Sequence, residues 1–203
     1  MQKYYNGHIS KTDRSLIKHQ NPCVIWMTGL SGAGKSSIAN ELEIALHQRS
    51  LHTYILDGDS IRQGLNKDLN YQDHERQENI RRISELSKLM LDAGLIVITA
   101  CISPFQKDRD EARNRIPHDE FIEVFVDTPI ALCEQRDPKG LYQKARAGHI
   151  KNFTGISSPY EPPKTPEIHL KAYDKTPHQA AQEIIEYLVK TERLFIGLTQ
   201  VKV

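Results

Sequence analysis

The stretch that decides the fold is Gly29-Leu30-Ser31-Gly32-Ala33-Gly34-Lys35-Ser36, which is followed by Ser37. It fits the pattern Gly-x4-Gly-Lys-Ser/Thr, in which backbone N–H groups surround phosphates, the lysine neutralises them and the hydroxyl reaches Mg²⁺. The apolar run 23–28 before it predicts a buried strand, and residues 37–46 after it have the apolar spacing of a helix. This order aims backbone N–H groups and the positive helix end at a polyphosphate. We therefore expect ATP on residues 29–37, with Lys35 on its β- and γ-phosphates and Ser36 on Mg²⁺.

The composition favours one domain that acts on small molecules. The 203 residues suffice for a sheet buried between helices. Lys and Arg number 27 against 26 Asp and Glu, so the net charge of +1 gives no reason to expect nucleic acid or a membrane as partner. Cys23, Cys101 and Cys133 lie in apolar surroundings, as free buried thiols do, and no apolar run is long enough for a signal peptide or a membrane span. We expect a cytoplasmic protein that binds small-molecule nucleotides.

Further apolar runs predict parallel strands with polar side chains at their exits. Residues 53–56 lead to Asp57 and Asp59, and residues 95–101 lead to Ile102 and Ser103. Because the carboxyl ends of parallel strands share one edge, the two carboxylates should face the phosphates held by Lys35. Asp-Gly-Asp is equally typical of a turn with a capping residue, and that alternative stays open. The runs 121–126 and 167–170 predict a fourth and a last strand.

A long helix is predicted over residues 76–93, with Asp73 as its N-cap. Arg76 and Asn79 lie three residues apart on one side of it, where both could reach one anion. Arginines at the start of an exposed helix more often do nothing but solvate it, so this alternative also stays open.

The segment 136–164 breaks the pattern of strands and helices. It is rich in glycine, lysine, arginine and proline, and a basic segment beside a phosphate site suits a lid that closes over anions and expels water. We call it the lid segment; an ordinary solvated loop is the alternative. The predicted organisation is an N-terminal arm (1–21) and one α/β domain (22–203), a parallel sheet flanked by helices with this lid.

Several blocks together resemble the adenylyl-sulfate kinase family, whose members transfer the γ-phosphate of ATP to the 3′-hydroxyl of adenosine 5′-phosphosulfate. The resemblance implies a nucleoside-kinase-like P-loop fold, Mg²⁺ as cofactor, ATP as co-substrate and a role in sulfate assimilation. A homodimer is a separate expectation. The blocks that carry it, in family order, are Gly29–Ser37, Leu56-Asp57-Gly58-Asp59 with Arg62-x-Gly64-Leu65-Asn66, Glu78-Asn79-Ile80-Arg81-Arg82, Ile102-Ser103-Pro104, Cys133-Glu134-x-Arg136-Asp137-Pro138-Lys139-Gly140-Leu141-Tyr142 and Ile150–Ile156.

The resemblance also implies roles for single residues. Asp59 is implied to be the partner of the acceptor's 3′-hydroxyl. Asp57, at the same strand exit, we expect on its own account to be a Mg²⁺ ligand, directly or through water. Ser103 matches a serine that is phosphorylatable in the family, although direct transfer needs no phosphoenzyme. The residues implied to bind the sulfated nucleotide are Asp59, Arg62, Tyr71, Arg76, Asn79, Ile102, Ser103, Lys139 in the lid and Phe153, which with Tyr71 would sandwich the adenine.

The chain departs from the family pattern at four positions. Tyr71 replaces Phe, which is a mild change because either ring stacks. Cys101 replaces Phe, Ser60 replaces Asn and Asn152 replaces Gly, all beside the acceptor. Two alternatives therefore accompany the kinase hypothesis: a related kinase of another nucleotide anhydride, and a non-catalytic nucleotide-sensing module.

Overall fold

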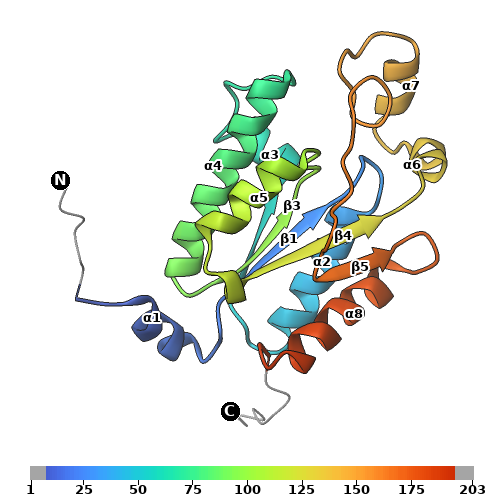
Figure 1. Cartoon of the computed structure of the whole chain (residues 1–203). Coiled ribbons are helices and arrows are strands. Elements are labelled where there is room, and N and C mark those ends of the chain that lie inside the picture. Colours follow the sequence, from blue (N-terminus) through green and yellow to red (C-terminus); the bar gives the residue numbers. More distant parts are fainter. Residues whose placement is uncertain (1–7, 195–203) are drawn as a thin grey trace, which may run out of the picture.

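Five strands form one parallel sheet, in the order β2-β3-β1-β4-β5 (Figure 1). The computed structural model describes residues 8–194. The strands are β1 (Val24–Thr28), β2 (Thr53–Asp57), β3 (Ile96–Ala100), β4 (Phe121–Asp127) and β5 (Ile168–Lys171). All pairs are parallel, so every strand exits at the same edge. The predicted α/β fold is confirmed.

Helices cover both faces of the sheet, because alternate strand residues point to opposite sides. On β1, Ile25 and Met27 pack in one core cluster with α2 (Lys35–His47) and α8 (Pro177–Lys190). Val24 and Trp26 pack in the other cluster, with α4 (Asp73–Asp92) and α5 (Gln106–Arg115). The central strands β1 and β3 are therefore buried at every position, which explains why they are apolar except for Thr28 and Thr99.

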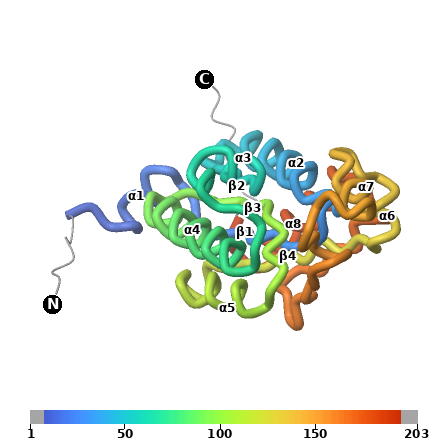
Figure 2. Tube along the Cα trace, turned by 90° about the horizontal axis from the view of Figure 1, so that it is seen from above, coloured from blue at the N-terminus to red at the C-terminus, as the bar shows by residue number. Residues whose placement is uncertain are grey.

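The lid segment lies beyond the carboxyl edge of the sheet. In Figures 1 and 2, α6 (Ile130–Arg136) and α7 (Leu141–Arg146) stand together at that end, followed by an irregular stretch that returns to β5. A short helix, α3 (Gly58–Gln63), follows β2, and a 3-10 turn (His118–Glu120) precedes β4. The carboxyl edge is therefore enclosed by α3, α4, α6 and α7.

The predicted arm contains one helix of the described residues, α1 (Lys11–Lys18). Arg14 binds the Asp92 carboxylate at 2.7 Å, and the Gln20 amide donates to the carbonyls of Gly94 and His52. These contacts hold the arm to the amino-terminal edge of the sheet, away from the lid segment. Residues 1–7 of the arm and 195–203 of the predicted domain lie outside the described residues, and the division at residue 21 stays a prediction.

One helix boundary was predicted wrongly. The long helix begins at Asp73, and its N-cap is Gln72. The reason is that the Glu75 carboxylate reaches back to accept from the backbone N–H groups of Gln72 (3.2 Å) and Asn70 (3.0 Å). These bonds lower the pKa of Glu75 and replace the expected cap from Asp73.

Two other expectations concern composition. Cys23, Cys101 and Cys133 are free and buried, as predicted, and burial raises the pKa of Cys23 and Cys101 to about 12. Between residues 8 and 194, every helix is too short or too polar to cross a bilayer.

The packing of α2 on the sheet makes a testable prediction. Leu42 is fully buried, whereas Ile44 on the same helix is 44% exposed. We expect Leu42→Ala to lower the free energy of unfolding by about 2–5 kcal/mol. Ile44→Ala, the matched control, should change it by less than about 1 kcal/mol. Urea denaturation measures both, and equal losses would contradict the assignment of the helix faces.

Candidate active site

The glycine loop between β1 and α2 is fixed by its neighbours. Gly29 has a φ of 148°, and a Cβ there would lie 2.5 Å from the carbonyl oxygen of Val126 on β4, so only glycine fits. The Thr128 hydroxyl, just after β4, donates to the carbonyl of Ala33 at 3.0 Å. The loop is therefore a rigid cradle that opens toward the N-terminus of α2.

Lys35 lies under this loop and is 8% exposed. Its Nζ donates to the carbonyl oxygens of Gly29 and Leu30, both at 2.8 Å. Burial lowers the pKa of Lys35 to about 8, and the nearby Asp57 and Asp59 oppose that shift only weakly. The site thus holds a lysine that is charged at neutral pH and gains from an approaching anion.

Asp57 ends β2 and performs two tasks at once. Its Oδ1 accepts from the backbone N–H groups of Asp59 and Ser60, which caps α3, while its Oδ2 accepts from the Ser36 hydroxyl at 2.7 Å. The capping alternative raised by the sequence therefore holds for one oxygen. The other oxygen and the Ser36 hydroxyl form a pair of hard donors beside the phosphate loop, which is the ligand chemistry Mg²⁺ takes from proteins when phosphates supply the rest.

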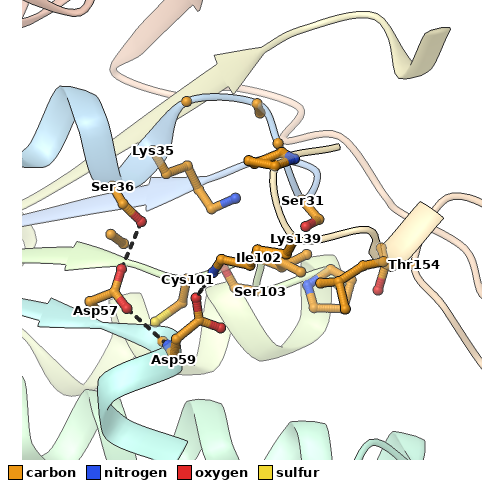
Figure 3. A pocket seen from close by; sticks show the side chains of 18 of the residues that line it. Ser31, Lys35, Ser36, Asp57, Asp59, Cys101, Ile102, Ser103, Lys139 and Thr154 are labelled. Atoms are coloured by element: carbon orange, nitrogen blue, oxygen red, sulfur yellow. Dashed lines mark hydrogen bonds and ion pairs between the residues drawn. The ribbon is translucent and has the colours of Figure 1, made fainter. Parts of the chain in front are cut away.

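Asp59 points into the cavity and pairs with Lys139 of the lid segment. Figure 3 shows this ion pair facing Lys35, with Asp57 to one side, where it is hydrogen-bonded to Ser36 and to the Asp59 N–H. More than half of each side chain is exposed, so both are free to rearrange when a ligand enters.

Arg76 is buried in the first turn of α4, so the alternative of a solvated arginine is wrong for it. Its Nη1 and Nη2 donate to the Thr154 hydroxyl and the Asn152 carbonyl, and its Nε donates to the Tyr71 carbonyl at 2.9 Å. Nothing in the sequence indicated that the lid segment would supply these partners. Asn79, also buried, accepts from the Asn66 amide at 2.9 Å.

Two aromatic rings line the same cavity in different settings. Tyr71 is 58% exposed, and the Arg62 guanidinium lies 4.5 Å from its ring centre while donating to the carbonyls of Leu69 and Asn70. Phe153 is 9% exposed and packs edge-on against Tyr142, with 4.9 Å between the two ring centres. In this arrangement Arg62 supports the loop that carries Tyr71.

Ser103 follows β3 with a φ of 39°, which is unusual for a residue with a side chain. It is 1% exposed, and its Oγ accepts from the Trp26 indole N–H at 3.2 Å. The Ser103 hydroxyl is thus hydrogen-bonded to a buried side chain of the core. Ile102, its neighbour, fixes the edge of β1 because its carbonyl accepts from the Thr28 hydroxyl at 2.6 Å.

These side chains share one cavity of about 970 Å³. Gly29 and Leu30 of the predicted site residues do not line it, and contribute through the carbonyls that hold Lys35. The predicted residues that line it are Ser31, Gly32, Ala33, Gly34, Lys35, Ser36, Ser37, Asp57, Asp59, Arg62, Tyr71, Arg76, Asn79, Ile102, Ser103, Lys139 and Phe153.

Comparison with known proteins identifies the family of this chain. A model of the family described as adenylylsulphate kinase matches residues 21–171. An adenylyl-sulfate kinase of Marinobacter nauticus is 53% identical over 93% of this chain and 95% of its own length. One of Aeromonas salmonicida is 62% identical over 82% of this chain and 85% of its own.

The solved structure of the Mycobacterium tuberculosis APS kinase in complex with AMPPNP and APS is also similar. It is 46% identical, has a TM-score of 0.80 and covers 83% of this chain and 98% of that one. The chain belongs to the adenylyl-sulfate kinase family.

The cavity extends to residues that the sequence analysis missed. Ala172 and Thr176, between β5 and α8, and Pro177, the first residue of α8, line it on the far side of β1 from β2 and β3. Tyr142, inside a block that carries the family resemblance, donates its hydroxyl to the Ser31 carbonyl at 2.9 Å and ties the lid segment to the phosphate loop. Its place in that block was the available signal.

The lowered pKa of Lys35 makes a prediction about ATP binding without acceptor. A polyphosphate favours the charged amine, so ATP affinity should be level below pH 8 and fall above it, by up to about tenfold per pH unit until the pKa of the complex is reached. Titration calorimetry from pH 7.5 to 9.5 measures this change.

Lys35→Met is the control for that titration, because it removes the titrating group from the loop. We expect its ATP affinity to be weaker and flat over the same range. A wild-type profile that is also flat would contradict the lowered pKa.

Proposed function

We propose that this protein phosphorylates the 3′-hydroxyl of adenosine 5′-phosphosulfate with ATP, through the residues that line the cavity. The observation that carries the proposal is that one cavity holds the phosphate loop, Asp59 and Arg76 in a chain of this family. ATP needs a phosphate cradle and a sulfated nucleotide needs separate anion contacts. Both sets of groups face the same space.

The ATP end follows from the loop. The N–H groups of residues 32–36 and the N-terminus of α2 bind the phosphates, and Lys35 neutralises the β- and γ-phosphates. With the acceptor on the β2 and β3 side, the adenine of ATP lies toward Ala172, Thr176 and Pro177. Mg²⁺ fits the Ser36 hydroxyl and Asp57 Oδ2, and when bound it neutralises charge on the transferring phosphoryl group.

The acceptor end is built around Asp59. Its carboxylate accepts a hydrogen bond from the 3′-hydroxyl, orients that oxygen for in-line attack on the γ-phosphorus and takes the proton late in a loose transition state. Lys139 leaves Asp59 as the acceptor arrives and turns to the phosphate oxygens. The ion pair seen here keeps both side chains directed into the cavity beforehand.

Arg76 and Asn79 receive the phosphosulfate and ribose. The fork of Arg76 now binds two groups of the lid segment, and an anion can replace them with stronger charge-assisted bonds. Tyr71 and Phe153 stack the acceptor's adenine, and Arg62 acts by holding the Tyr71 loop. Ser103 shapes the wall, because its hydroxyl is buried and accepts a hydrogen bond from the Trp26 indole N–H.

The Asn152 departure from the family pattern suits this site. Asn152 has a φ of 56°, a conformation that asparagine tolerates better than most residues, so it replaces glycine at little cost. Cys101 lies under Gly58, with its Sγ 3.5 Å from where a Cβ of Gly58 would be, and leaves more room there than the usual Phe.

The proposal includes two expectations about the whole protein, its cellular location and its oligomeric state. One is a cytoplasmic location, the other a homodimer. An APS kinase of Thiobacillus denitrificans, whose solved structure is described as hexameric, is 26% identical with a TM-score of 0.67 and covers 91% of this chain and 31% of that one. That likeness supports self-association in general, and the homodimer stays a prediction.

An acceptor panel tests the function directly. ADP release from ATP is followed with adenylyl sulfate, AMP, CMP or a cytidine anhydride as the second substrate. We expect release with adenylyl sulfate alone, because only it carries the sulfate that the Arg76 and Asn79 side would bind. Release with the cytidine anhydride alone would reassign the acceptor, and ATP binding without release in any reaction would favour a nucleotide sensor.

The two carboxylates have separable roles. Asp59→Asn keeps the shape but cannot take a proton, so we expect kcat to fall roughly 10²–10⁴-fold with little change in the KM for ATP. Asp57→Asn should instead raise the Mg²⁺ concentration needed for half the maximal rate, because a ligand charge is lost. Steady-state rates across a Mg²⁺ titration measure both. Recovery of the Asp59 variant in high Mg²⁺, without recovery of the Asp57 variant, would reverse the assignments.

A further inference from the structure

A buried arginine outside the cavity joins one of its walls to the C-terminal part of the lid segment. Arg109, on α5, is 1% exposed. Its Nε donates to Glu123 on β4 at 2.9 Å, its Nη1 to the Ser103 carbonyl at 2.7 Å, and its Nη2 to the Glu161 carbonyl at 2.6 Å and the Gln106 side chain at 2.9 Å. A buried guanidinium spread over four partners fixes their relative positions.

The wall that Arg109 holds is the exit of β3. Ser103 lines the cavity in a left-handed conformation that a non-glycine residue adopts only when its surroundings impose it. Arg109 holds its carbonyl, and Trp26 holds its hydroxyl. The Arg109 contact therefore helps to set where Ser103 and its neighbour Ile102 stand against a bound acceptor.

The second element that Arg109 holds is the C-terminal part of the lid segment. The Glu161 N–H donates to the Pro104 carbonyl at 2.8 Å, and the Glu161 carboxylate accepts from the Gln106 N–H at 2.7 Å. One residue earlier, the Tyr160 hydroxyl bonds the Thr28 hydroxyl at 3.0 Å, at the end of β1. Residues 160–161 thus form a fixed base from which the rest of the lid segment extends over the cavity.

We propose that Arg109 is a positioning residue for the acceptor. It fixes the β3 exit at Ser103 and the base of the lid segment at Glu161 relative to each other. The proposal rests on the function proposed above. The phosphate loop makes no hydrogen bond with Arg109 among the described residues, so ATP binding should not depend on it.

A purely structural role is the rival explanation, and the chain offers a matched control. Arg113 lies one helical turn further along α5 and also pairs with Glu123, at 3.3 Å, and with Glu167 at 2.6 Å. Its hydrogen bonds within the described residues reach neither Ser103 nor Glu161. Loss of Arg113 therefore damages the same ion network without releasing the β3 exit or the base of the lid segment.

The experiment compares Arg109→Met, Arg109→Lys and Arg113→Met in kinetics, ATP binding and thermal unfolding. We expect Arg109→Met to lower kcat/KM for adenylyl sulfate roughly ten- to a hundredfold, the cost of small misplacement at a reacting centre. Its KM for ATP should stay within about twofold of wild type. Lysine should not rescue the variant, because one ammonium cannot span the three directions of the fork. Arg113→Met should lower the unfolding temperature. Its kcat/KM for adenylyl sulfate and its KM for ATP should both stay within about twofold of wild type.

A second variant covers failure to fold. Arg109→Met leaves the Glu123 carboxylate, whose pKa burial already raises, with one cation fewer. The double variant Arg109→Met, Glu123→Gln removes that charge, and we expect it to fold and show the same loss toward adenylyl sulfate. Inability of both variants to fold would make Arg109 a structural residue and overturn the proposal.

Three further outcomes would also overturn it: equal losses toward ATP and adenylyl sulfate, no loss toward either, or the same acceptor loss in Arg113→Met. These are distinct from failure of the proposed function. If the wild-type protein binds ATP but does not phosphorylate adenylyl sulfate, the function fails before any variant is compared.

Discussion

The structure depends first on keeping the Lys35 ammonium charged in a place where burial favours the neutral amine. The carbonyls of Gly29 and Leu30 stabilise the charge, and they converge on it only because Gly29 packs directly against Val126. β4 and Thr128 thereby fix the loop from one side, and Tyr142 of the lid segment fixes it from the other. A buried cation with two neutral partners is poorly compensated, so the site gains much from a polyphosphate.

An excess of positive charge that an anionic ligand can compensate is found over the whole cavity. The chain carries a net charge of +1, yet seven Lys and Arg side chains line the cavity against three Asp. Charge that nearly cancels over the molecule is thus concentrated where two anionic nucleotides are proposed to meet. A local field of this kind raises substrate concentration at the site without making the surface attractive to nucleic acid. The near-zero net charge alone therefore says little about the ligands.

Sequence reasoning gave the sheet, the phosphate loop and the two carboxylates because these depend on local patterns: apolar runs, glycines and strand exits. It left the role of Arg76 open because the partners that bury it, Asn152 and Thr154, lie far along the chain. It passed over Arg109, which stands in a helix of mostly charged residues and reads as solvated. A signal was nonetheless present, since Glu123 is a lone carboxylate in the apolar run of β4, and a buried charge needs a buried partner.

The lid segment is held to the nucleotide site at separate points, and this bears on how an alcohol can compete with water for the phosphoryl group. Tyr142 ties its beginning to the phosphate loop, Arg76 grips its middle, and Arg109 fixes its base beside the β3 exit. The bonds of Tyr142 and Arg109 lie away from the reacting groups and can persist through a reaction cycle. The bonds of Arg76, and of Lys139 with Asp59, occupy groups that the acceptor itself would use. An entering acceptor can therefore replace the bonds of Arg76 and Lys139 while the other two attachments of the lid segment stay in place. Closure of the lid segment over the cavity, and exclusion of water, can then accompany binding.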